Sequence, residues 1–94
     1  MKITTDTGFT CEIDKSIFDD FRTLSAMGKM FDDSRESTQR MAAASRIIEL
    51  VLGKDESRLM EHCTKNGHCS PEDVFAELND IMAKVSEDSE TKKE

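Results

Sequence analysis

The side chains with the clearest chemical potential lie in one short stretch, HCTKNGHCSP, at residues 62–71. Two adjacent His-Cys pairs, His62-Cys63 and His68-Cys69, fall there with four residues between them. Imidazole and thiolate groups are ligands that zinc prefers, so the stretch first suggests a metal site. A Cys-His pair could also supply a nucleophile and its activating base.

The spacing of these pairs does not match the usual zinc patterns. Zinc signatures separate the two ligands of a pair by a few residues and place a loop between the pairs. Adjacent residues on a helix point about 100° apart, so His62 and Cys63 would not easily bind one ion together. A site of two or three ligands, built from Cys63 with His68 or Cys69 across the turn, is the alternative. We predict no metal and no cofactor.

Packing explains Cys63 without a ligand. It follows Leu59 and Met60 at helical spacing, which predicts that it faces the core. A buried thiol behaves as a small hydrophobic side chain. Cys63 is therefore interpreted as a core residue that ends a helix.

Packing explains Cys69 in a similar way. It directly precedes Ser70, the expected N-cap of a helix that begins with proline and acidic residues. Its side chain could pack on Val74 as a hydrophobic staple. Both imidazoles, His62 and His68, are then expected on the solvent side of the turn.

Nothing in the remaining sequence supports catalysis. The Cys-His pairs lack a third group to orient them and a glycine-rich loop to stabilise an oxyanion. The carboxylate pairs Asp19-Asp20 and Asp32-Asp33 are interpreted as solvated helix ends. No phosphate loop, dinucleotide fingerprint or EF-hand pattern is present in the sequence. We therefore predict that the protein is not an enzyme.

The charge balance limits the classes of partner. The chain of 94 residues carries 20 acidic against 13 basic side chains, a net charge of −7. Such a balance opposes binding to nucleic acid and to anionic membranes. No run approaches the roughly 20 apolar residues of a membrane span, and the N-terminus has no apolar signal core. We expect a cytoplasmic protein whose three cysteines remain thiols.

The elements that position these residues indicate a mainly α fold of the α+β class, opened by a β-hairpin over residues 2–13. Gly8 lies in a segment whose residue types are typical of a turn. Phe9, Cys11 and Ile13 share one face of a strand in which side chains alternate between two sides. About four short amphipathic helices are predicted to follow, at 15–31, 36–52, 55–64 and 71–86. Together they form a single small domain, 1–86, followed by a charged tail, 87–94, that is expected to be disordered.

Apolar periodicity assigns the core faces of the first two helices. The first helix begins after Asp14 as its N-cap. Its apolar stripe contains Ile17, Phe21, Leu24 and Gly28, and is widened by Phe18, Ser25 and Met27 to Phe31. The second begins between Ser34 and Thr38, and its small residues MAAAS permit another helix to approach closely. Its stripe contains Met41, Ala44, Ile47, Ile48, Val51 and Leu52.

The six methionines have two interpretations. Most are expected to fill the core. The alternative is that some line an adaptable apolar groove for a partner helix, because methionine side chains repack readily. The candidate partner-binding residues are Met27, Met30, Phe31, Met41, Phe75 and Met82.

The order of these motifs resembles the small tail assembly chaperones of long-tailed bacteriophages and prophages of Gram-positive bacteria. The resemblance rests on the opening MKITTDTGFTCEID, on FDDF at 18–21, on VLG at 51–53 and on the final helix SPEDVFAELNDIMAKV. It covers about residues 1–86. It departs at DDSRESTQRMAAAS, which is longer and more polar than the compact linker of that family. In similar proteins the positions of Cys63 and Cys69 are usually Leu or Val.

The resemblance implies a chaperone without catalytic residues. Such proteins bind apolar helical segments of the tape-measure protein in the host cytoplasm and keep it soluble. Tail-tube protein, a second expected partner, then polymerises around it, and the chaperone is absent from the mature virion. Self-association into a homo-oligomer is left open. The alternative is a small acidic regulatory protein, anti-repressor or antitoxin-like, that masks a basic surface; the net charge motivates it.

Overall fold

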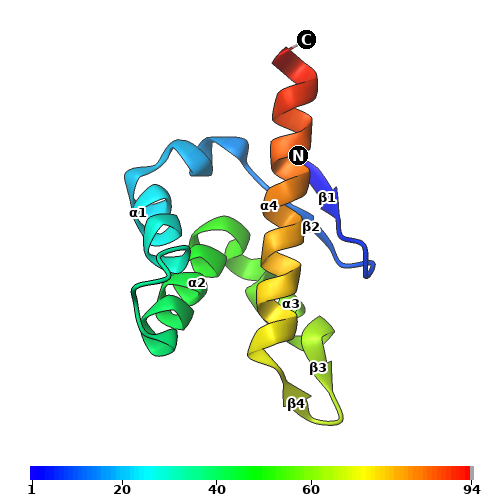
Figure 1. The fold of residues 1–94 in the computed structure, drawn as a ribbon. Coiled ribbons are helices and arrows are strands. Elements are labelled where there is room, and N and C mark those ends of the chain that lie inside the picture. Colours follow the sequence, from blue (N-terminus) through cyan, green and yellow to red (C-terminus); the bar gives the residue numbers. More distant parts are fainter. Residues whose placement is uncertain (94) are drawn as a thin grey trace.

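The computed structural model describes the backbone of residues 1–93 and the side chains of residues 1–87. Its described part is mainly helical, as expected, with a short β-hairpin at the N-terminal end. The helices are α1 (Phe21–Met30), α2 (Ser37–Leu52), α3 (Glu56–Cys63) and α4 (Pro71–Lys93). Figure 1 shows α4 as a long helix, with α1 and α2 to one side of it and the first hairpin to the other.

The first hairpin pairs β1 (Lys2–Thr4) with β2 (Thr10–Glu12) in antiparallel register, with Ile3 opposite Cys11. Ile3, Phe9, Cys11 and Ile13 are all buried, so the predicted inward face is confirmed. An isolated two-stranded hairpin is marginally stable in water. This hairpin is held because its apolar side packs on the helices, with β1 against α4.

The segment expected as one helix over 15–31 is divided in two. Lys15–Asp19 forms a 3-10 helix that begins after Asp14, the expected N-cap. Asp20 then adopts an extended backbone and its carboxylate accepts from the Arg22 N–H, which starts α1. The Arg22 guanidinium and that backbone N–H lower the pKa of the Asp20 carboxyl to about 2. Asp20 was expected inside a helix but breaks it, because its carboxylate satisfies a free backbone donor.

The core face of α1 also differs from the expected one. The helix buries a side that carries one polar, one small and one large apolar residue: Thr23, Ala26 and Met30. Phe21 and Leu24, which were expected in the core, are 80% and 50% exposed. At 100° per residue the expected stripe lies on nearly the opposite side of the helix from the buried one. The centre of the predicted stripe is therefore wrong within α1, where Ala26 faces inward instead. Met30, one of the residues that widened the stripe, is buried.

The second helix follows the prediction closely. A capping box between Glu36 and Gln39 starts α2. The expected stripe is buried from Ala44 to Leu52, and only its first member, Met41, reaches the surface at 39% exposure. Contacts between α1 and α2 are extensive, because the alanines in the middle of α2 let the helices approach. The Arg40 guanidinium also donates to the Met30 carbonyl at the end of α1, over 3.0 Å.

A second hairpin, not expected from the sequence, follows α3. Strands β3 (Thr64–Lys65) and β4 (His68–Cys69) pair across the two-residue turn Asn66-Gly67. Both turn residues have positive φ, 55° and 77°, the geometry that favours Asn-Gly in tight hairpins. The predicted turn is confirmed, but its two-residue strands are too short to leave a periodic pattern.

The last helix is longer than expected. α4 runs to Lys93, past the boundary predicted near residue 86, and so includes most of the segment expected as a disordered tail. That segment contains neither Gly nor Pro and is rich in Glu and Lys, which favour helix. Its final residue, Glu94, lies outside the described residues. In the described part of the chain no helix is long and apolar enough to cross a membrane.

Candidate functional site

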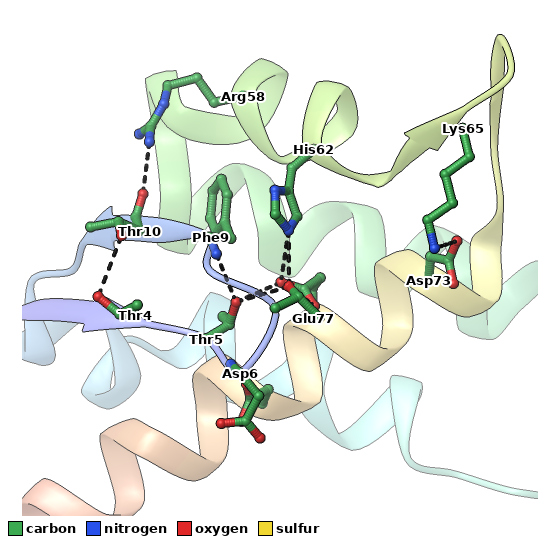
Figure 2. Close-up of polar contacts among 12 residues, drawn as sticks. Thr4, Thr5, Asp6, Phe9, Thr10, Arg58, His62, Lys65, Asp73 and Glu77 are labelled. Carbon is green, nitrogen blue, oxygen red and sulfur yellow. Dashed lines mark hydrogen bonds and ion pairs between the residues drawn. The ribbon is translucent and has the colours of Figure 1, made fainter.

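A buried carboxylate, Glu77, lies at the centre of a cluster of polar contacts between the first hairpin, α3 and α4 (Figure 2). Only 6% of Glu77 is exposed. Its Oε1 accepts from the Thr5 hydroxyl and its Oε2 accepts from the Thr7 hydroxyl, both over 2.8 Å. The Thr5 oxygen accepts in turn from the Phe9 N–H over 3.0 Å. The cluster therefore fastens the turn of the first hairpin to α4.

The hydrogen-bond pattern also indicates which ring nitrogen of His62 carries a hydrogen. The Thr7 hydroxyl proton is given to Glu77, so the 2.9 Å contact between Thr7 Oγ1 and His62 Nε2 requires Nε2–H as the donor. The same imidazole nitrogen lies 3.8 Å from Glu77 Oε1, and the ring stacks obliquely on Phe9. His62 and His68 were both expected on the solvent side of a turn, and both residues are exposed. What the sequence did not indicate is that His62 also joins α3 to the first hairpin through Thr7.

A second set of contacts holds the same hairpin turn from α4. The Asp6 N–H donates to the Asp80 carboxylate over 2.7 Å, and the Lys84 ammonium lies within 3.0 Å of both aspartates. The Asp6 N–H and then the Lys84 ammonium lower the pKa of the Asp80 carboxyl. The hydrogen bonds to Asp80 and Asp6 raise the pKa of Lys84. Together these contacts immobilise the hairpin turn on α4.

A small cavity of about 130 Å³ lies beside this cluster. It is lined by Thr7, His62, Cys63, Lys65, Asp73, Ala76 and Glu77. Burial raises the pKa of the Cys63 thiol to about 11, and nearby Cys69 and Glu77 contribute. The thiol is therefore protonated near neutral pH, which makes it a poor nucleophile and a poor metal ligand. Among the described residues, no three His, Cys, Asp or Glu side chains converge on a point where a metal ion could bind.

A different kind of site lies between α2, α3 and α4. It is a mostly apolar groove of about 330 Å³, which we call the α2–α4 groove. It is lined by Met41, Ala44, Ser45, Ile48, Met60, Cys69, Pro71, Val74 and Phe75. Cys69 and Val74 line it together, as the predicted staple requires. Cys63 is buried in the core, as predicted.

The structure separates the six predicted partner-binding residues. Met41 and Phe75 come from different helices and line the same groove. Phe31 is 53% exposed at the end of α1. Met27 and Met82 are half-buried against the core. Met30 is 2% exposed and fills the core, so it offers no surface to a partner, contrary to the prediction.

The sequence carries one signal for the polar cluster, the position of Glu77. Glu77 falls three residues after Val74 and four before Ile81, which places its carboxylate inside the apolar stripe of α4. A charged residue at such a position is rarely buried without a partner. Its partners, Thr5 and Thr7, lie on a distant hairpin and only the fold brings them to α4.

Comparison with known proteins adds no assignment: no family model, no curated protein and no solved structure matches the chain.

Proposed function

We propose that this protein is a phage tail assembly chaperone that binds and solubilises apolar helical segments of the tape-measure protein. The observation that carries the proposal is the α2–α4 groove, where Met41 and Phe75 line one apolar opening. At about 330 Å³ the groove accommodates side chains rather than a whole helix. An amphipathic partner helix would lie across it and insert apolar side chains, which flexible methionines accommodate by repacking.

Charge supports a partner with basic flanks. The helix α4 forms one wall of the groove, and its residues 71–93 include seven acidic residues and three lysines. Glu72 directly follows Pro71, which lines the groove. A partner helix with an apolar stripe between basic residues would satisfy both the groove and this acidic wall.

The sequence resemblance supplies the identity of that partner. A tape-measure protein exposes long apolar helical stripes that would aggregate without cover. Many copies of a small acidic protein could coat its length in the host cytoplasm. Each copy would bind weakly, be displaced by tail-tube protein and be absent from the mature virion. No cofactor and no catalytic step are part of this role.

The experiment is co-expression with the tape-measure protein of the same genome, measuring how much of that protein remains soluble. We expect wild type to raise the soluble fraction and Met41→Ser to lose most of that gain, because Met41 lines the groove. Ala42→Ser is the matched control: it is the next residue of α2, is exposed and does not line the groove. No gain with wild type would refute the proposal, and equal loss in both variants would remove the groove from it.

The acidic content of residues 71–94 also favours a second candidate, a small acidic regulatory protein that masks a basic surface. Salt separates the two functions. Binding to a basic surface should collapse near 1 M salt, where the Debye length is about 3 Å, while insertion into the groove should persist. A neighbouring gene that encodes a very long helical protein would favour the chaperone. The absence of such a gene would favour the regulator.

A further inference from the structure

The outward face of α1 is a continuous apolar stripe that the described remainder of the chain leaves exposed. We define this α1 face by Phe21, Leu24, Gly28 and Phe31. The three large side chains are 80%, 50% and 53% exposed, and all four positions fall on one side of a helix at 100° per residue. Contiguous exposed apolar surface on a small protein marks an interaction site.

Gly28 lies on this face, and packing within the chain does not explain why the residue is a glycine. An added Cβ there would meet no atom within 4 Å in the described structure, so internal packing does not require glycine. Glycine in an exposed helix interior destabilises the helix relative to alanine. Its effect here is a dent in the stripe between Leu24 and Phe31, where another backbone or side chain can approach closely.

We propose that the α1 face binds a second copy of this chain, with the two α1 helices antiparallel about a two-fold axis. The stripe is symmetric in spacing: Phe21 and Phe31 lie five residues either side of position 26, and Leu24 and Gly28 lie two either side. In that arrangement Leu24 of each copy fills the dent at Gly28 of the other. Phe21 then meets Phe31 of the other copy. A two-fold interface needs such a self-complementary patch.

Charge also favours a second copy at this place. The net charge of −7 opposes self-association in general, but it is concentrated in residues 71–94. Residues 14–40, around α1, carry six acidic and five basic side chains. Acids at the ends of the stripe already hold partners within the chain: Asp20 with Arg22 at 2.9 Å and Asp32 with Arg35 at 3.3 Å. Two copies therefore meet here with little repulsion.

The interface is small. Three large side chains from each copy provide less than the roughly 1,200 Å² of a standard complex, so the association depends on protein concentration. The α1 face and the α2–α4 groove share no residue, so this interface does not rest on the proposed function.

Sedimentation of the full chain over a concentration series is the test. We expect a monomer–dimer equilibrium in wild type. Leu24→Ser should raise the dissociation constant roughly tenfold or more, because the proposed dimer buries this leucine and serine gains little from burial. Gly28→Ala gives the sharper result. It should raise the thermal midpoint of the dilute monomer through helix propensity and yet weaken the dimer by filling the dent.

Two controls complete the experiment. Met41→Ser, in the groove, should leave dimerisation unchanged. With Cys69→Ser as background, a Phe21→Cys chain mixed with a Phe31→Cys chain should form the mixed disulfide in preference to either homodimer, as antiparallel packing requires.

Three outcomes would overturn the proposal. One is a wild-type protein that stays monomeric at every attainable concentration. Another is a dimer that Leu24→Ser does not weaken. The third is a monomer whose Leu24→Ser variant fails to solubilise the tape-measure protein; the α1 face would then belong to the partner rather than to a second copy.

Discussion

The hydroxyl of Thr5 donates a 2.8 Å hydrogen bond to the carboxylate of Glu77, 72 residues later in the chain. Both residues are buried. A buried carboxylate is costly unless donors surround it, and here two threonines of one hairpin turn supply those donors. The bond therefore links the placement of the first hairpin to the position of α4.

Thr5→Val should destabilise the protein by about 1–3 kcal/mol. The change removes a donor to Glu77 and the acceptor of the Phe9 N–H, and leaves both buried groups short of a partner. Urea unfolding measures the loss. Thr4→Val is the control, because Thr4 lies on the same hairpin but is exposed, and its effect should stay within about 0.5 kcal/mol. Similar losses from both variants would contradict the role given to the cluster.

Thr23→Val should stabilise the protein by about 1 kcal/mol. Thr23 is fully buried and its Oγ1 has no hydrogen-bond partner among the described residues. Valine keeps the shape and removes the unsatisfied hydroxyl. Thr23→Ser, which keeps the hydroxyl and opens a small cavity, should destabilise. Thermal unfolding of both variants gives the comparison, and a valine variant less stable than wild type would show that the hydroxyl has a partner.

The contact between Asp80 and the hairpin turn should contribute to stability in a pH-dependent way. The pKa of Asp80 is lowered in the folded protein, so the unfolded chain takes up this proton first as the pH falls. The contribution is therefore complete above the unfolded pKa of about 3.9 and is lost as the pH falls through the folded value. Asp80→Asn should be less stable than wild type at neutral pH, with a difference that shrinks in acid.

Measuring the free energy of unfolding in urea from pH 7 downward tests this prediction. Repeating the substitution in a Lys84→Met background isolates the lysine, since the Asp6 N–H remains. A difference between Asp80→Asn and wild type that stays constant into strong acid would contradict the assigned pKa direction.

The three thiols should react in a defined order. Burial raises the pKa of Cys11 and of Cys63 to about 11, so near pH 8 both are protonated as well as inaccessible. Cys69 is half-buried at the groove. Alkylation of the native protein followed by mass spectrometry should modify Cys69 first, and the other two at a comparable rate only after unfolding. Early modification of Cys63 would contradict its place in the core.

Local sequence patterns predicted most of the fold. The alternation around Phe9 and Cys11 defined the first hairpin, and the Asn66-Gly67 turn was visible because two positive φ values need those residue types. The periodicity of α2 identified its buried side, because that helix is covered along one continuous stripe. These features depend on neighbours within a few residues, so a single chain displays them directly.

The candidate sites were only partly predictable. Met41 and Phe75 were named separately as partner-binding residues, and the packing of α2 against α4 was needed to place them in one groove. Met30 failed as a candidate because methionine suits both a core and a groove, and composition does not distinguish the two.

The sequence by itself determined the approximate positions of the four main helices and of the first hairpin, the Asn66-Gly67 turn and how acidic the chain is. Only the tertiary structure decided that α1 turns Ala26 inward and leaves Phe21 and Leu24 exposed. An amphipathic pattern shows that a helix has an apolar side, but it does not show what covers that side. The packing of α1 on α2 and the bond between Thr5 and Glu77 depend on which elements the folded chain brings together. Local sequence patterns do not encode that arrangement.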